Sequence, residues 1–228
     1  FTGGALLGDR FRMKNSALED NIYIRSMGTR GSMGGLSQAT SSAIIVLDAF
    51  GKDIILVETC GTGQAEVDVV SATDTTVVVC VPGMGDEIQA MKAGVMEIGD
   101  IFAANKADLK NVEKLIDDIE VTLHMGMGKG GWEPPVIKTT ATQNKGVDDL
   151  VETIFEHRSY LVRSGALKKK KQERIRREII EIAKNKMIRR FGTLTINKQN
   201  VFKGLVEKVM LHKIDPYTAA EDLLNIEK

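Results

Sequence analysis

The chain has 228 residues, of which 43% are hydrophobic, so it can bury one sizeable core with an appended element. Its 31 basic and 31 acidic residues cancel, which removes the overall field that draws a protein to nucleic acid or to an anionic membrane. No apolar run approaches the length of a membrane span. The two cysteines, Cys60 and Cys80, lack metal-type spacing and are typical of a reduced cytosolic protein. Because the first residue is Phe1, we expect the chain to begin inside a longer protein.

Short β-branched runs and helical periodicities alternate along the first two thirds of the chain. Runs bounded by turn signals are typical of buried strands, and apolar residues spaced by three or four are typical of helices. We expect strands over 21–25, 54–57, 76–81, 101–104 and 136–139, and helices over 36–50, 88–98 and 112–119. This alternation predicts an α/β fold with a mostly parallel sheet and helices on both faces.

The pattern changes after His157, where no further strand is predicted. Helices are expected over 158–191, over 201–211 and from Asp215-Pro216, a capping residue followed by proline. They are too few to bury a core of their own. We therefore divide the chain at 158/159 and expect residues 159–228 to pack on the α/β domain or on another subunit.

The strongest chemical motif is Asn105-Lys106-Ala107-Asp108, which directly follows a predicted strand. Guanine presents two N–H donors on one edge, and an aspartate can accept both in a charge-assisted pair. Adenine lacks that donor pair, so the motif favours a guanine nucleotide. The alternative is a strand-end turn with a solvated Lys-Asp pair. Thr140-Ala141 ends the next predicted strand, where a backbone N–H could meet the base carbonyl.

A second acidic strand end is Glu58, followed by a glycine-rich turn that includes Gly61 and Gly63. It is suited to a Mg²⁺-bound water and a terminal phosphate, although plain tight turns have the same pattern. Asp9 is either a second Mg²⁺ partner or an ordinary loop aspartate. Gln64 is a further catalytic candidate without a settled role. One helix side carries Asp86, Gln89 and Lys92, which form either a solvated face or a surface that responds to nucleotide.

Several segments together resemble the MeaB/ArgK family of P-loop GTPases of the SIMIBI class, which is related to the human methylmalonic aciduria type A protein. They are FTGGALLGDRFRM, RSMGTRGSMGGL, ILVETCGTGQAEV, VPGMGDEIQAMKAGVMEI, NKAD and DPYTAAEDLL. The resemblance implies a cytoplasmic, homodimeric GTPase that uses GTP, GDP and Mg²⁺. It also implies that the protein protects an adenosylcobalamin-dependent mutase, chiefly methylmalonyl-CoA mutase, and gates its cofactor loading. Residues 1–158 would be the GTPase domain and 159–228 the dimerisation arm.

Position by position, the resemblance assigns roles to the candidate residues. It implies base recognition by Asn105, Lys106, Asp108, Thr140 and Ala141; catalysis by Glu58, Gly61 and Gln64; metal binding by Asp9 and Glu58; and relay to the mutase by Asp86, Gln89 and Lys92. The family's phosphate-binding GxxxxGK[ST] loop does not occur in these residues. We therefore expect this chain as it stands to bind GTP poorly and to hydrolyse it hardly at all. Alternatives are a metallochaperone-type GTPase, an amino-acid transport kinase or a binding module without catalysis.

Overall fold

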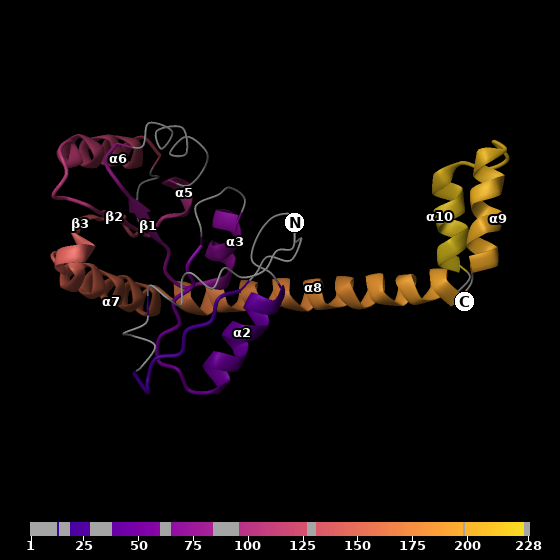
Figure 1. Cartoon of the computed structure of the whole chain (residues 1–228), viewed down its shortest axis with the longest axis horizontal. Coiled ribbons are helices and arrows are strands. Elements are labelled where there is room, and N and C mark those ends of the chain that lie inside the picture. Colours follow the sequence, from indigo (N-terminus) through magenta and orange to yellow (C-terminus); the bar gives the residue numbers. More distant parts are fainter. Residues whose placement is uncertain are drawn as a thin grey trace. The chain divides into compact units, whose positions relative to one another are not determined.

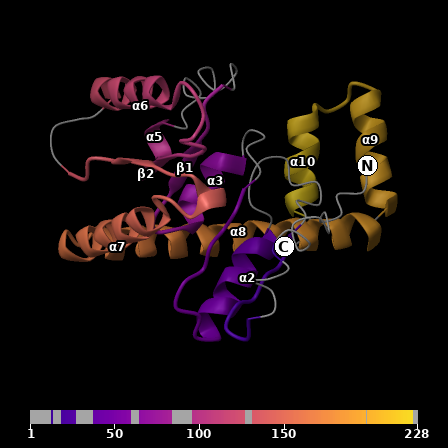
Figure 2. The ribbon, with the colours of Figure 1, turned by 60° about the vertical axis from the view of Figure 1, so that its left-hand side comes forward.

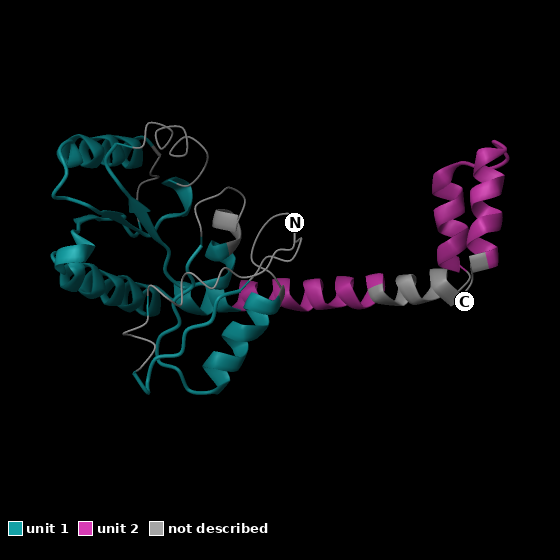
Figure 3. Cartoon of the chain, in the orientation of Figure 1, with its two compact units in different colours: residues 1–171 teal, residues 172–228 magenta. Residues whose placement is uncertain are grey.

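The structure is a computed structural model that describes residues 13, 19–27, 38–59, 65–83, 96–126, 131–197 and 199–225. The chain divides into two compact units, residues 1–171 and residues 172–228 (Figure 3). The division falls inside one long helix, α8, which spans Ala166–Asn197. Each unit is described below by itself.

The described part of unit 1 is built on a three-stranded parallel sheet in the order β1-β2-β3 (Figure 1). The strands are β1 (Val77–Cys80), β2 (Ile101–Ala104) and β3 (Val136–Lys138). Val77 pairs with Ile101, and Phe102 pairs with Val136. All four residues of β2 are buried, as expected for a central parallel strand that is covered on both faces. The fold class predicted from the sequence is confirmed.

Helices cover both faces of this sheet. In unit 1 the described helices are α2 (Gln38–Ala49), α3 (Ala65–Ala72), α5 (Met96–Ile98), α6 (Val112–Gly126), the 3₁₀ helix η3 (Ala141–Gln143) and α7 (Val147–Arg163). Helix α6 contacts β2 and β3, and α7 contacts β2. In Figures 1 and 2 these two helices lie on opposite sides of the strands.

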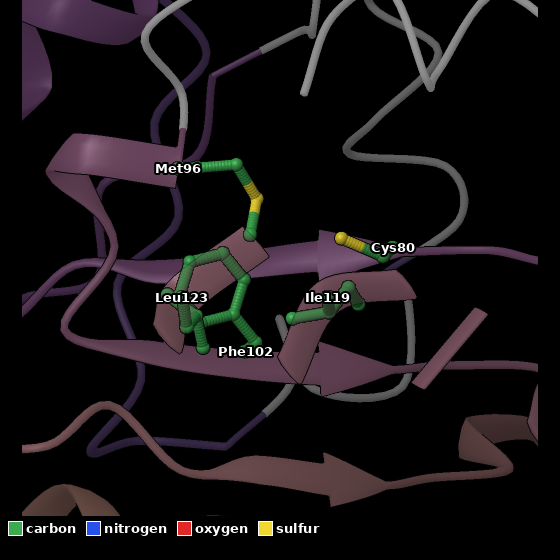
Figure 4. Close-up of a cluster of buried hydrophobic side chains, with 5 residues drawn as sticks. All are labelled: Cys80, Met96, Phe102, Ile119 and Leu123. Carbon is green, nitrogen blue, oxygen red and sulfur yellow. The ribbon is translucent and has the colours of Figure 1, made fainter. Parts of the chain in front are cut away.

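The core of unit 1 lies between α6 and the sheet (Figure 4). Helix α6 presents Val112, Ile116, Ile119 and Leu123 at helical spacing, and all four are buried. Ile119 and Leu123 join a cluster of buried side chains formed by Cys80, Met96, Phe102, Ile119 and Leu123. Burying each large apolar side chain contributes roughly 1.5–3 kcal/mol. This packing fixes the plane of the sheet and therefore the strand ends, where the candidate site lies.

Two predicted strands are absent from the described sheet. Residues 21–25 and 54–57 have an apolar, β-branched composition but no strand pairing. Ile54 is 62% exposed and Leu56 is 88% exposed, so neither side chain is buried between layers. A strand needs a partner as well as a favourable composition, and local pattern alone cannot supply one.

The helix predicted over 158–191 is also wrong in its boundaries. Residues from 158 to Arg163 complete α7, and Ala166 begins α8. Gly165 separates the two helices with a left-handed φ of +73°, a conformation that glycine adopts without steric cost. The periodicity predicted over 88–98 is described only at α5, because 84–95 lie outside the described residues.

Unit 2 contains most of α8, followed by α9 (Gln199–Met210) and α10 (Pro216–Asn225). Helix α9 packs against α10. Asp215 caps α10, because its Oδ1 accepts hydrogen bonds from the backbone N–H groups of Tyr217 at 2.8 Å and Thr218 at 3.1 Å. Its Oδ2 accepts a further bond from the Thr218 hydroxyl. The predicted capping residue is confirmed.

Candidate guanine-nucleotide site

The carboxyl ends of β2 and β3 are joined by backbone hydrogen bonds that continue past the strands. The Thr139 N–H donates to the Ala104 carbonyl at 2.9 Å, and the Ala107 N–H donates to the Thr139 carbonyl at 3.0 Å. On the other side of β2, the Asn105 N–H donates to the Cys80 carbonyl at 2.8 Å. The Asn-Lys-Ala-Asp loop and the Thr-Thr-Ala loop therefore lie side by side at one edge of the sheet. Parallel α/β sheets bind ligands at this edge.

The side chain of Asn105 fastens these two loops together. Its Oδ1 accepts a hydrogen bond from the Thr139 hydroxyl and a second from the Ala141 N–H, each at 3.2 Å. Among the described residues, no hydrogen bond is donated by its amide nitrogen. The sequence places a backbone N–H of Thr140-Ala141 where it could meet the base carbonyl; in the structure the Ala141 N–H donates to Asn105 and the Thr140 N–H donates to the Lys145 carbonyl.

The turn after β2 presents Asp108 to solvent. Lys106 has a φ of +56°, and its carbonyl accepts a hydrogen bond from the Leu109 N–H at 2.9 Å. A non-glycine residue in this left-handed region is uncommon, and such residues gather at functional sites. The side chains of Lys106 and Asp108 are exposed. The carboxylate of Asp108 is therefore free to accept hydrogen bonds from outside the protein.

The second loop is closed by a feature that the sequence analysis did not predict. Thr140 and Lys145 exchange two backbone hydrogen bonds, of 2.9 and 3.3 Å, around η3. Gly146 then has a φ of +69°, and a Cβ built there would lie 2.0 Å from the carbonyl oxygen of Lys138. Only glycine allows the chain to pass so close to the end of β3. The sequence signal was Asn144-Lys145-Gly146, because asparagine and glycine both tolerate left-handed backbone.

The phosphate end predicted from the sequence is described only at Glu58. This residue is exposed and follows the unpaired segment 54–57. The other predicted residues of this end and of the relay surface lie outside the described residues: Asp9, Gly61, Gln64, Asp86, Gln89 and Lys92. Among the described residues, no three His, Cys, Asp or Glu side chains gather closely enough to hold a metal ion. Within the described residues, the candidate site therefore consists of the Asn-Lys-Ala-Asp loop and the Thr-Thr-Ala loop, which Asn105 joins.

Within the described part of the chain, no helix is both long and apolar enough to cross a bilayer. A parallel α/β sheet with an Asn-Lys-x-Asp loop fastened to a Thr-Ala loop at its carboxyl edge defines a nucleotide-binding protein of the P-loop GTPase class. The chain belongs to the MeaB/ArgK family of this class. The profile described as methylmalonyl-CoA mutase-associated GTPase MeaB matches residues 1–195.

Individual relatives agree with this assignment. A protein named as a GTPase from Pyrococcus abyssi is 47% identical over 227 residues, which cover 98% of this chain and 69% of the relative. The mouse mitochondrial protein named methylmalonic aciduria type A homolog is 30% identical over 232 residues, which cover 100% of this chain and 55% of the relative. The crystal structure of a LAO/AO transport system kinase has the same fold, with a TM-score of 0.59 at 24% identity. The match covers 83% of this chain and 62% of that structure.

Proposed function

We propose that this chain carries the guanine-recognition site of a GTPase that serves an adenosylcobalamin-dependent acyl-CoA mutase. The observation that supports base recognition is the Asn105 side chain, which holds the Asn-Lys-Ala-Asp loop against the Thr-Thr-Ala loop. With both loops held, the exposed carboxylate of Asp108 can accept the two N–H donors of guanine. The amide nitrogen of Asn105 is a second group that can bind the base, as a hydrogen-bond donor. Lys106, Thr140 and Ala141 shape the two loops around it.

The hydrolytic end of the reaction is proposed from family membership. Glu58, Gly61 and Gln64 are the candidates for positioning the attacking water and the terminal phosphate, and Asp9 and Glu58 are the candidates for holding Mg²⁺. Mg²⁺ would supply charge neutralisation at the phosphates. The printed sequence contains no GxxxxGK[ST] stretch, so the backbone cradle for the phosphates is not among these residues. We therefore propose that this chain by itself binds the base weakly and does not turn GTP over.

Base recognition can be tested by changing the hydrogen-bond donors and acceptors of Asp108 and of the base. Xanthine carries a carbonyl where guanine carries its amino group, so an Asp108→Asn variant should prefer xanthosine diphosphate to GDP. Loss of one charge-assisted hydrogen bond costs about 1.5–3 kcal/mol, which corresponds to about a tenfold to hundredfold change in Kd. NMR chemical-shift titration at millimolar nucleotide would measure the Kd for GDP, ADP and xanthosine diphosphate.

The matched control is Asp117→Asn, since Asp117 is an exposed carboxylate within α6 and outside the two loops of the candidate site. It should bind the three nucleotides as the unchanged chain does. Equal binding of ADP and GDP by the unchanged chain would contradict base recognition. An Asp108→Asn variant that still prefers GDP would contradict the role of Asp108. Binding of GDP by the chain with a micromolar Kd would contradict the proposed weakness of the isolated chain.

The partner proposal rests on the family description, which associates its members with methylmalonyl-CoA mutase. We propose residues 1–158 as the GTPase domain, residues 159–228 as a dimerisation arm, and Asp86, Gln89 and Lys92 as the relay to a cytoplasmic mutase. Exposed apolar side chains on unit 2 suit an interface with a second copy: Ile179 is 62%, Ile188 is 66% and Met210 is 75% exposed.

Two measurements test the partner proposal. Light scattering should give twice the chain mass, and capture by purified mutase subunits should differ between GTP and GDP for the protein that contains a phosphate-binding loop. Monomeric mass would contradict the arm. Equal capture by the mutase subunits in GTP and in GDP would contradict the proposed relay.

A further inference from the structure

A cluster of charged and aromatic side chains lies at the amino end of the sheet, away from the nucleotide-site loops. Asp100 directly precedes β2, and Thr75 lies two residues before β1 begins. Trp132 comes from the segment before β3, and His157 comes from α7. Lys170 comes from the beginning of α8. All five residues belong to unit 1, so the geometry of the cluster is internal to that unit.

Asp100 is the central member of this cluster. Its Oδ2 accepts a hydrogen bond from the Thr76 N–H at 2.8 Å, and its backbone carbonyl accepts one from the Trp132 indole N–H at 2.7 Å. The ammonium group of Lys170 lies 3.5 Å from the same Oδ2 and donates to the Asp74 carbonyl at 2.8 Å. Lys170 thus ties the beginning of α8 to the residues before β1 and β2.

His157 is buried against this ion pair. Its side chain is only 1% exposed, and its Nε2 lies 3.5 Å from Asp100 Oδ1. Its Nδ1 lies within hydrogen-bonding distance of the Thr75 hydroxyl, at 2.9 Å. The ring centroid of His157 is 4.7 Å from that of Trp132 and 6.3 Å from that of Tyr160. A neutral ring with its proton on Nε2 satisfies both polar neighbours, since it donates to Asp100 and accepts from Thr75.

We propose that Asp100, His157 and Lys170 form a proton-sensitive latch that holds the beginning of α8 on the amino end of the sheet. While His157 is neutral, the Asp100 carboxylate balances the charge of Lys170. A proton on His157 adds a second positive charge beside the same carboxylate, in a place where water cannot solvate it. The protonated ring then competes with Lys170 for Asp100 and repels the ammonium group, so the latch is weakened.

The direction of the pH effect follows from the groups that face His157. Burial lowers the pKa of His157; Asp100 opposes this by raising it, and Lys170 lowers it again. Tyr160 is a further titratable side chain whose ring faces His157, and the aromatic ring of Trp132 also lies against it. When the latch opens, the pKa returns toward its ordinary value of about 6.5. Protons therefore favour the open form as pH falls below about 6.5.

The chain contains one tryptophan, and its ring lies beside His157, so Trp132 fluorescence reports on the ring directly. We expect quenching as His157 is protonated, with a midpoint below about 6.5. Lys170→Met should raise that midpoint because it removes a repelling charge, and Asp100→Asn should lower it because it removes an attracting one. Lys169→Met is the matched control, since Lys169 is the exposed neighbour of Lys170, and it should leave the midpoint unchanged.

The state of the latch itself is measured by hydrogen exchange at the amides of 167–171, corrected for the intrinsic pH dependence of exchange. We expect protection to fall across the same midpoint and to show no such step in His157→Gln. Protection that is independent of pH in the unchanged chain would overturn the proposal. A midpoint that is unchanged or lower in Lys170→Met would also overturn it. This variant keeps the test decisive if His157→Gln does not fold. Histidines 124 and 212 are exposed, and replacing both with glutamine should change neither measurement.

Discussion

Replacing Gly146 with alanine tests how the second loop of the nucleotide site is held. Gly146 and Gly165 have nearly the same left-handed φ, +69° and +73°. A methyl group at 146 would lie 2.0 Å from the Lys138 carbonyl oxygen, whereas nothing lies within 4 Å of one at 165. Both substitutions carry the backbone cost of an L-residue in this region, roughly 1–2 kcal/mol, partly offset by the lower entropy of the unfolded chain.

Only Gly146→Ala adds a clash with backbone, and relieving such overlap costs typically about 1–3 kcal/mol. We expect a loss in the free energy of unfolding of roughly 2–4 kcal/mol for Gly146→Ala and of about 1 kcal/mol for Gly165→Ala. Urea denaturation followed by Trp132 fluorescence measures both, because both glycines and Trp132 lie in unit 1. Equal losses would refute the argument that the approach to Lys138, rather than φ alone, makes glycine necessary.

Three further changes test other parts of the fold. Phe102→Ala removes a fully buried side chain and should cost about 3–5 kcal/mol in urea denaturation, while the half-exposed Phe155→Ala should cost clearly less. The Thr218 hydroxyl is the largest cause of the lowered pKa of Asp215, so Thr218→Ala should raise that pKa in an NMR titration. The stability that this pair contributes is present above about pH 4 and is lost as pH falls further. Because burial lowers the pKa of His157, the folded state binds fewer protons than the unfolded one. Stability of unit 1 should fall as pH drops below about 6.5, and an unchanged slope in His157→Gln would contradict this.

The strands that the sequence predicts well are those whose local pattern and packing agree. Residues 101–104 form β2 with the predicted bounds, and β1 and β3 lie within their predicted ranges. Residues 54–57 have an equally good pattern but no described pairing, because pairing depends on a partner far away in the chain. The break between α7 and α8 escaped prediction because helix-compatible residues lie on both sides of it and only Ser164 and Gly165 separate the two helices. The left-handed φ of Gly165 shows in the structure where the first helix ends.

The candidate site shows the same division between local and distant information. A motif after a strand predicts where Asn105 lies, because strand ends meet at one edge of a parallel sheet. It cannot predict that the side-chain Oδ1 of Asn105 accepts a hydrogen bond from the Ala141 N–H, since that bond joins residues 36 positions apart. The contact between Thr75 and His157 spans 82 positions. No motif links these two residues, so the latch could be found only from the folded chain.

Strand β2 connects the latch residues to the candidate nucleotide site, because Asp100 precedes the strand and Asn105 follows it. At about 3.3 Å per residue, the two residues are separated by about 16 Å. The strand cannot slide to change that distance, because a shift of one residue would move Phe102 out of the core and reverse the faces of its neighbours. Asn105 is also held from both sides, by the Cys80 carbonyl and by the loop after β3. We therefore expect protonation of His157 to affect α8 through Lys170 while the loops of the candidate nucleotide site keep their positions. The two ends of the sheet can thus be tested independently.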